Sequence, residues 1–229
     1  MSITKNLNYL YNKISKDIKV VAVSKTKPNQ DILEAYNFGH KCFGENKVQE
    51  LTEKFNSLPK DIEWHFIGHL QRNKVKYIIK FINLIHSVDS YKLLNEINKR
   101  AEHEKRIVNC LIQVKIASEE NKYGFDINEI DNVINFSKNL NNINIKGFMG
   151  MSTLTDNKNI ILNEFSKLQN LFESYKSNKL DIYAFYVVDS FGSMTFDELK
   201  SYFNLADLNL NNNVSLGYHS HNNMQLAFS

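Results

Sequence analysis

The hydrophobic and polar positions of this 229-residue chain follow two alternating patterns. Short apolar runs such as Val20 to Val23 are typical of strands buried on both faces. Longer segments, such as Ile3 to Ile18, place apolar residues every three or four positions, which predicts helices with one buried face. Strands are predicted at residues 20–24, 40–43, 62–68, 84–88, 108–117, 145–149, 182–188 and 214–218. Helices are predicted at residues 3–18, 29–38, 47–58, 71–81, 91–104, 126–139, 160–175 and 197–205.

The alternation of strands and helices predicts right-handed βαβ units and therefore a parallel sheet. Eight such units close into a (β/α)8 TIM-type barrel, a fold of typically about 250 residues. We predict a single α/β barrel domain over residues 1–229, with an extra N-terminal helix and with strand 214–218 paired to strand 20–24. The alternative is an open, doubly wound sheet. The first strand is not followed by the GxGxxG motif of its dinucleotide-binding version.

Lys25 stands where the first predicted strand ends, which is the edge at which α/β barrels build their sites. A lysine at such a position is partly desolvated, so its pKa falls and its neutral amine can attack a carbonyl to form a Schiff base. The alternative is an ordinary solvated loop lysine. Other strand ends bring small and polar residues to the same edge, at residues 43–46, 65–68, 87–89, 115–118, 149–153, 189–193 and 218–222.

The composition describes an ordinary globular protein, with 42% hydrophobic and 23% charged residues. The net charge is only +3 and both signs are interspersed, so we expect no nucleic-acid partner, and the basic run 72–76 is interpreted as a solvated helix face. Cys42 and Cys110 are far apart and are expected to be buried, reduced thiols, which suits a cytoplasmic protein. The N-terminus lacks the apolar core of a signal peptide and no stretch is long enough to span a membrane, so we expect no membrane partner.

Four motifs resemble those of the pyridoxal phosphate homeostasis protein family, in order, over residues 1–175. They are Ala22-Val23-Ser24-Lys25-Thr26-Lys27-Pro28, Phe43-Gly44-Glu45-Asn46, Trp64-His65-Phe66-Ile67-Gly68 and Gly147-Phe148-Met149. The resemblance implies the barrel of the alanine racemase N-terminal domain, with pyridoxal 5′-phosphate held on Lys25 as a Schiff base. It implies a role in vitamin B6 cofactor homeostasis or delivery to apo-enzymes, without established turnover. We expect a monomer.

Three further residues of these motifs are candidate cofactor contacts: Asn46, His65 and Met149. Asn46 and His65 have an alternative interpretation as structural polar groups with partners inside the protein. Trp64 and His86 are expected in the core.

The last quarter of the chain departs from that family, so we divide the barrel into a cofactor-binding part, residues 1–182, and an atypical closing segment, residues 183–229. The family binds the phosphate with a Ser-x-Gly-Met-Ser loop and an Arg-Ile-Gly run. Ser190, Gly192 and Gly217 fall at matching positions, but Ser215 replaces the arginine. The loss of a charge-assisted hydrogen bond, about 1.5–3 kcal/mol, predicts an affinity lower by one to two decades.

Residues 183–229 also resemble metal-dependent aldolases and lyases related to hydroxymethylglutaryl-CoA lyase. His219 and His221 are two apart on a predicted strand, so both imidazoles point the same way, as a pair of metal ligands requires. The third ligand of that family is an aspartate at the end of the first strand, where this chain has Lys25. Because an incomplete ligand set binds poorly, we predict no functional metal site here, and a metal-dependent lyase remains the alternative function.

Overall fold

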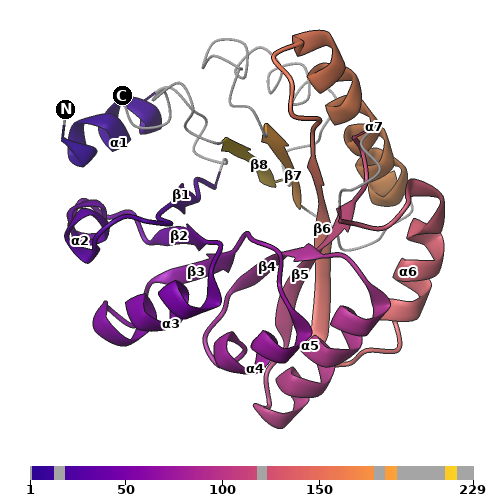
Figure 1. The fold of residues 1–229 in the computed structure, drawn as a ribbon, viewed down its shortest axis with the longest axis horizontal. Helices are drawn as coiled ribbons and strands as arrows, with labels where there is room; N and C mark the ends of the chain where they lie inside the picture. Colours follow the sequence, from indigo (N-terminus) through magenta and orange to yellow (C-terminus); the bar gives the residue numbers. More distant parts are fainter. Residues whose placement is uncertain (1, 13–18, 118–122, 178–183, 190–214, 221–229) are drawn as a thin grey trace.

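The computed structural model describes residues 2–12, 19–117, 123–177, 184–189 and 215–220. Strands and helices alternate along the chain, as the hydrophobic pattern predicts (Figure 1). The strands are β1 (Ala22–Val23), β2 (Cys42–Glu45), β3 (Glu63–Phe66), β4 (Leu84–Val88), β5 (Val108–Val114), β6 (Ile143–Met151), β7 (Ala184–Asp189) and β8 (Ser215–Ser220). The helices are α1 (Ile3–Tyr11), α2 (Asn29–Asn37), α3 (Val48–Ser57), α4 (Val75–Ile78), α5 (Tyr91–His103), α6 (Ile130–Ser137) and α7 (Lys158–Ser177), and two short 3-10 turns are η1 (Arg72–Lys74) and η2 (Ile127–Glu129).

The eight strands form one parallel sheet in which each strand pairs with its neighbours in sequence, from β1 to β8. Figure 1 shows the strands arranged around a ring with the helices outside it. This is the arrangement of a (β/α)8 barrel with an extra N-terminal helix, so the predicted fold class is confirmed.

The predicted pairing of strand 214–218 with strand 20–24 is wrong for the described residues. Among them, β8 pairs with β7 and β1 pairs with β2, and no ladder joins β8 to β1. The physical reason is the length of β1, because a strand of two residues offers few backbone groups for a second ladder.

Apolar side chains pack against both faces of the sheet. The larger cluster lies between the outer face of the strands and the helices, and it includes Trp64, which the sequence places in the core. A smaller cluster lies inside the barrel and is formed by Leu84, Leu111, Met149, Ala184 and Tyr186. A parallel sheet covered in this way is buried on both faces, which explains why the sequences of its strands are continuous apolar runs.

Most element boundaries lie within a few residues of the prediction, and residues 71–81 show the main difference. They form η1 and the four-residue helix α4 instead of one long helix. Ile78, Ile79 and Ile82 are fully buried here, so packing against the barrel determines the path of this segment. The predicted helix 3–18 ends at Tyr11, with residues 13–18 outside the described residues, and the predicted helix 197–205 lies outside them as well.

Helix α2 ends at Asn37, within one residue of the predicted helix 29–38, and Gly39 follows its C-cap, Phe38. This glycine has a φ of +107°. The Gly39 amide donates to the Tyr36 carbonyl and the His40 amide donates to the Ala35 carbonyl, at 2.9 and 3.0 Å. These two hydrogen bonds form a Schellman motif, in which a residue without Cβ adopts the left-handed conformation without strain.

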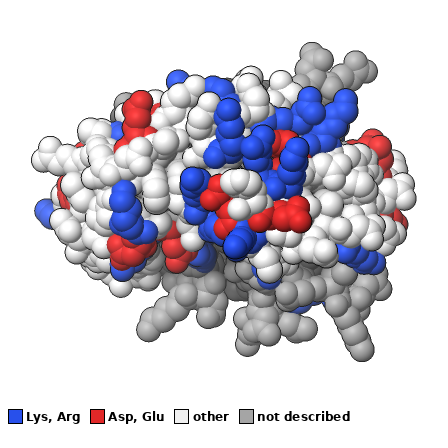
Figure 2. Space-filling view, turned by 90° about the horizontal axis from the view of Figure 1, so that it is seen from below, with Lys and Arg blue, Asp and Glu red and all other residues white. Residues whose placement is uncertain are grey.

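Charged side chains of both signs share the surface. On the face in Figure 2, acidic side chains lie among basic ones. The exposed ion pair of Lys41 with Asp61 and the partly exposed pair of Arg100 with Glu96 join opposite charges in the same way. None of the described helices is long and apolar enough to cross a membrane.

Candidate cofactor site

Lys25 lies in a turn just beyond the C-terminal end of β1 and is half-buried. Two residues earlier, Val23 pairs with Gly44 of β2. Among the described residues, the Lys25 ammonium makes no hydrogen bond. Burial lowers its pKa, and the negative charge of Glu45 opposes that shift. The turn therefore presents an amine that is neutral more often than that of a solvated lysine, at the edge where barrels build their sites.

A buried ionic network fixes the residues on both sides of Lys25. The Ser24 hydroxyl donates to Glu45 Oε1 at 2.6 Å, and Lys54 Nζ donates to that oxygen and to the Ser24 carbonyl at 2.7 Å each. Lys54 also donates to Glu50 Oε1 at 2.7 Å, and the same oxygen accepts from the Thr26 amide at 2.6 Å. Lys54 of helix α3 therefore links both neighbours of Lys25 to β2.

Two features of this network next to Lys25 are energetically unfavourable: the buried carboxylate of Glu45 and the backbone conformation of Thr26. Burial raises the pKa of Glu45, while the hydrogen bonds from Lys54 and Ser24 lower it. Its second oxygen, Oε2, has no hydrogen-bond partner among the described residues. Thr26 has a φ of +64°, which is unfavourable for a β-branched residue, so the bond from its amide to Glu50 holds it in place.

His65 is buried inside the barrel and both of its ring nitrogens contact protein atoms. Nδ1 lies 3.0 Å from Nε2 of His86, and Nε2 lies 3.4 Å from Sγ of Cys42. Burial, together with the positive charge of the nearby Lys19, lowers the pKa of His65 to about 3, so the ring is neutral near pH 7. The His86 ring in turn packs edge-on against Tyr186, with centroids 4.5 Å apart. These contacts place His65 in a structural polar cluster, and its contact with a cofactor stays a prediction.

Asn46 and Met149 differ in burial. Asn46 follows β2 directly and is half-buried, and its backbone packs so closely on Gly68 that a Cβ there would lie 2.3 Å from the Asn46 carbonyl oxygen. The Ser87 hydroxyl donates to the Gly68 carbonyl, so the ends of β2, β3 and β4 meet at the edge that carries Lys25. Met149 is buried in the interior cluster beside Tyr186.

The predicted phosphate contacts are only partly described. Gly217 lies in β8, where its backbone pairs with Tyr186, and Ser215 pairs with Ala184. Ser190 and Gly192 lie outside the described residues, as does His221, whereas the backbone of His219 pairs with Val188 of β7. The roles predicted for these residues therefore stay predictions.

Sequence reasoning missed Lys54 and a surface cleft. Lys54 stands four residues after Glu50 on one helix, and this spacing was the available clue to their ion pair. The cleft has a volume of about 520 Å³ and lies beside the loops that follow β3 and β4, lined among others by Arg72, Lys92 and Glu96.

The two cysteines, Cys42 and Cys110, are buried and form no disulfide, as predicted.

The fold is a (β/α)8 barrel with a lysine at the end of its first strand. Comparisons with known proteins identify the family of such barrels to which the chain is related. The family model described as alanine racemase, N-terminal domain, matches residues 1–206. The pyridoxal phosphate homeostasis protein of Pasteurella multocida is 36% identical over 162 residues, which cover 69% of this chain and 70% of that protein. The homologue with the same name in Aquifex aeolicus is 39% identical over 154 residues, covering 67% and 68%. The chain belongs to the pyridoxal phosphate homeostasis protein family.

Solved structures agree with this assignment. PipY of Synechococcus elongatus, solved without pyridoxal phosphate, has a TM-score of 0.77 and 25% identity and covers 99% of this chain and 100% of its own. The same protein has also been solved with pyridoxal phosphate bound, with a TM-score of 0.77 and 23% identity.

The expected similarity of residues 183–229 to metal-dependent lyases is not supported by the comparisons. The family match continues to residue 206 and PipY covers almost the whole chain. A short His-x-His motif at the end of a strand is too small a pattern to define a family against this overall agreement.

Proposed function

We propose that this chain binds pyridoxal 5′-phosphate through Lys25 and acts in vitamin B6 cofactor homeostasis. The observation that carries the proposal is the Lys25 amine at the C-terminal edge of the barrel. It is half-buried, its pKa is lowered, and it makes no hydrogen bond among the described residues. When bound, the cofactor supplies an aldehyde that condenses with a neutral amine to give a Schiff base and water. The names of the relatives and the PipY structure with bound cofactor support the proposal.

The residues around Lys25 have distinct roles in this proposal. The network of Ser24, Glu45 and Lys54 orients the amine by fixing its turn. Asn46, His65 and Met149 surround the cofactor, and Ser190, Gly192 and Gly217 hold its phosphate through backbone N–H groups. Because Ser215 replaces an arginine, the phosphate lacks one charge-assisted hydrogen bond and dissociates more readily.

Borohydride labelling tests the proposal. The protein loaded with pyridoxal phosphate is expected to absorb as a Schiff base, and this absorbance should disappear on reduction, leaving the label on the peptide that contains Lys25. Lys25→Ala should abolish the band, whereas Lys27→Ala, which removes the exposed lysine of the same loop, should keep it. A label on Lys27, or an unchanged band in Lys25→Ala, contradicts the proposal.

The proposal extends to the physiological role. We infer that residues 1–229 form a single barrel that acts as a cytoplasmic monomer and passes the cofactor to apo-enzymes. Mixing the loaded protein with an apo-enzyme, in the presence of a trap for free pyridoxal phosphate, should restore enzyme activity faster than the spontaneous release rate allows. A reactivation rate that does not exceed the rate of spontaneous cofactor release contradicts direct transfer. Sedimentation at micromolar concentration tests separately whether the protein is a monomer.

A further inference from the structure

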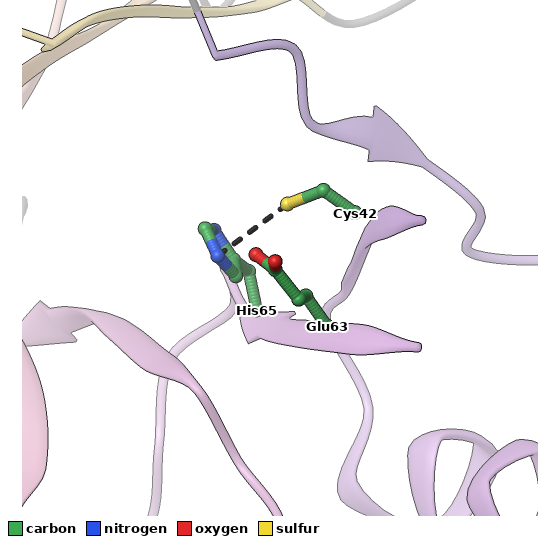
Figure 3. Close-up of side chains that lie close together, drawn as sticks. All are labelled: Cys42, Glu63 and His65. Carbon is green, nitrogen blue, oxygen red and sulfur yellow. Dashed lines mark hydrogen bonds between the residues drawn. The ribbon is translucent and has the colours of Figure 1, made fainter. Parts of the chain in front are cut away.

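Three side chains of different chemistry converge at the N-terminal end of the barrel, opposite Lys25. Cys42 and Glu63 are the first residues of β2 and β3 and pair directly across the sheet, and His65 follows Glu63 by two residues on the same face. Figure 3 shows the thiol, the carboxylate and the imidazole pointing toward one another. Lys25 and Cys42 differ by four residues in strand register, or roughly 13 Å, so the Cys42 thiol lies well away from the lysine of the cofactor site.

The distances between the three groups suit a tetrahedral metal ion. One donor atom from each of Cys42, Glu63 and His65 lies within 4.8 Å of the others. Cys42 Sγ and His65 Nε2 are 3.4 Å apart, and tetrahedral Zn²⁺ requires about 3.3–3.8 Å between its ligands. The Glu63 carboxylate therefore needs to move by only about 1 Å, well within the freedom of a half-exposed side chain.

The surroundings of His65 orient it as a metal ligand. Its Nδ1 lies 3.0 Å from His86 Nε2, so a proton on Nδ1 is donated to His86 and Nε2 is left to face Cys42. Metal-bound histidines usually have such a partner on the second nitrogen, because it fixes the tautomer and the ring orientation.

A cation already occupies the open side of the cluster. Lys19 forms an ion pair with Glu63, and their side chains are 45% and 43% exposed. The flexible lysine stem can turn its ammonium into solvent, so a divalent ion can replace it as the counter-ion of Glu63. Because both side chains are partly exposed, this side of the cluster is accessible to solvent.

We propose that Cys42, Glu63 and His65 bind Zn²⁺, with water in the fourth position. A thiolate, an imidazole and a carboxylate are the ligand types that select Zn²⁺ over Mg²⁺ or Ca²⁺. As the Zn–S bond forms, Cys42 releases its thiol proton to solvent, and Lys19 moves away from Glu63 without changing its charge. The site holds the N-terminal ends of β2 and β3 together.

Metal titration of the chain, with and without added pyridoxal phosphate, tests the site. After treatment with EDTA, the chain should bind one Zn²⁺ in competition with a chromogenic chelator, and Co²⁺ should produce a sulfur-to-cobalt charge-transfer band. Cys42→Ser should weaken Zn²⁺ binding by at least 100-fold and abolish the band, whereas Cys110→Ser, at the other buried cysteine, should leave both unchanged. Lys19→Gln should strengthen binding about fivefold, because it removes the competing cation.

The opposite results overturn the proposal. Absence of the Co²⁺ band in the unmodified protein excludes cysteine ligation whatever the variants do. Zn²⁺ binding that survives Cys42→Ser but is lost in His219→Ala places the metal at the other end of the strands. Weaker binding in Lys19→Gln means that Lys19 supports the metal instead of competing with it. None of these measurements depends on whether Lys25 carries the cofactor.

Discussion

Replacing Lys54 by methionine should destabilise the protein because it leaves a buried carboxylate without its cation. The Lys54 side chain is 6% exposed and donates hydrogen bonds of 2.7 Å to Glu45, to Glu50 and to the Ser24 carbonyl. Methionine fills much of the same volume but donates nothing. Removing one partner of a buried ion pair costs about 3–5 kcal/mol. Glu45 can relieve part of this by taking up a proton, since burial already raises its pKa, so we expect the lower end, about 3 kcal/mol.

Urea unfolding followed by the fluorescence of Trp64, the single tryptophan, measures this change. Lys47→Met is the matched control, because Lys47 is exposed immediately before the same helix, and it should change the free energy of unfolding by less than about 0.5 kcal/mol. The double variant Glu45→Gln with Lys54→Met removes the stranded charge and should recover part of the loss.

The same variant should also affect Lys25, because Lys54 fixes the turn through the Ser24 carbonyl and Glu50. Borohydride labelling of Lys25 by pyridoxal phosphate should slow in Lys54→Met under conditions where the variant is fully folded. A loss of stability below 1 kcal/mol, together with normal labelling of Lys25, refutes the reasoning about this network.

Three other predictions address the strands and the titrating groups. Gly147→Ala should destabilise the protein by at least about 2 kcal/mol in urea unfolding, since Gly147 has a φ of +152° and a Cβ would lie 1.5 Å from the Ala184 carbonyl oxygen; a neutral result means that β6 and β7 can separate freely. The labelling rate of Lys25 should rise with pH and reach half its maximum below pH 10.5, because burial lowers the pKa of its amine; a midpoint at or above that value contradicts the desolvation. Because the pKa of His65 falls from 6.5 to about 3 on folding, the unfolded chain alone takes up this proton between those pH values. The free energy of unfolding should therefore decrease as the pH falls through that window, by up to about 1.4 kcal/mol per pH unit, and His65→Asn in EDTA should show a smaller slope.

The sequence by itself determined the elements, the parallel sheet and the place of Lys25. Short β-branched runs and amphipathic segments carry their own periodicity, so each element is specified by residues close together in the chain. The same holds for the end of α2, where Gly39 permits a left-handed cap. Strict alternation then leaves few topologies, and all of them place the lysine after β1 at the C-terminal edge.

Only the tertiary structure decided which side chains meet. Ser24 and Lys54 are separated by 30 positions, and their contact depends on how α3 packs over β2. The approach of Cys42 to His65 follows from the register of β2 against β3, which no local pattern contains. The division of residues 71–81 into η1 and α4 also depends on packing, because the burial of Ile78 and Ile79 outweighs the preference for one long helix. Periodicity reports which face of an element is buried, whereas the partner on that face is set by the three-dimensional arrangement of the whole barrel.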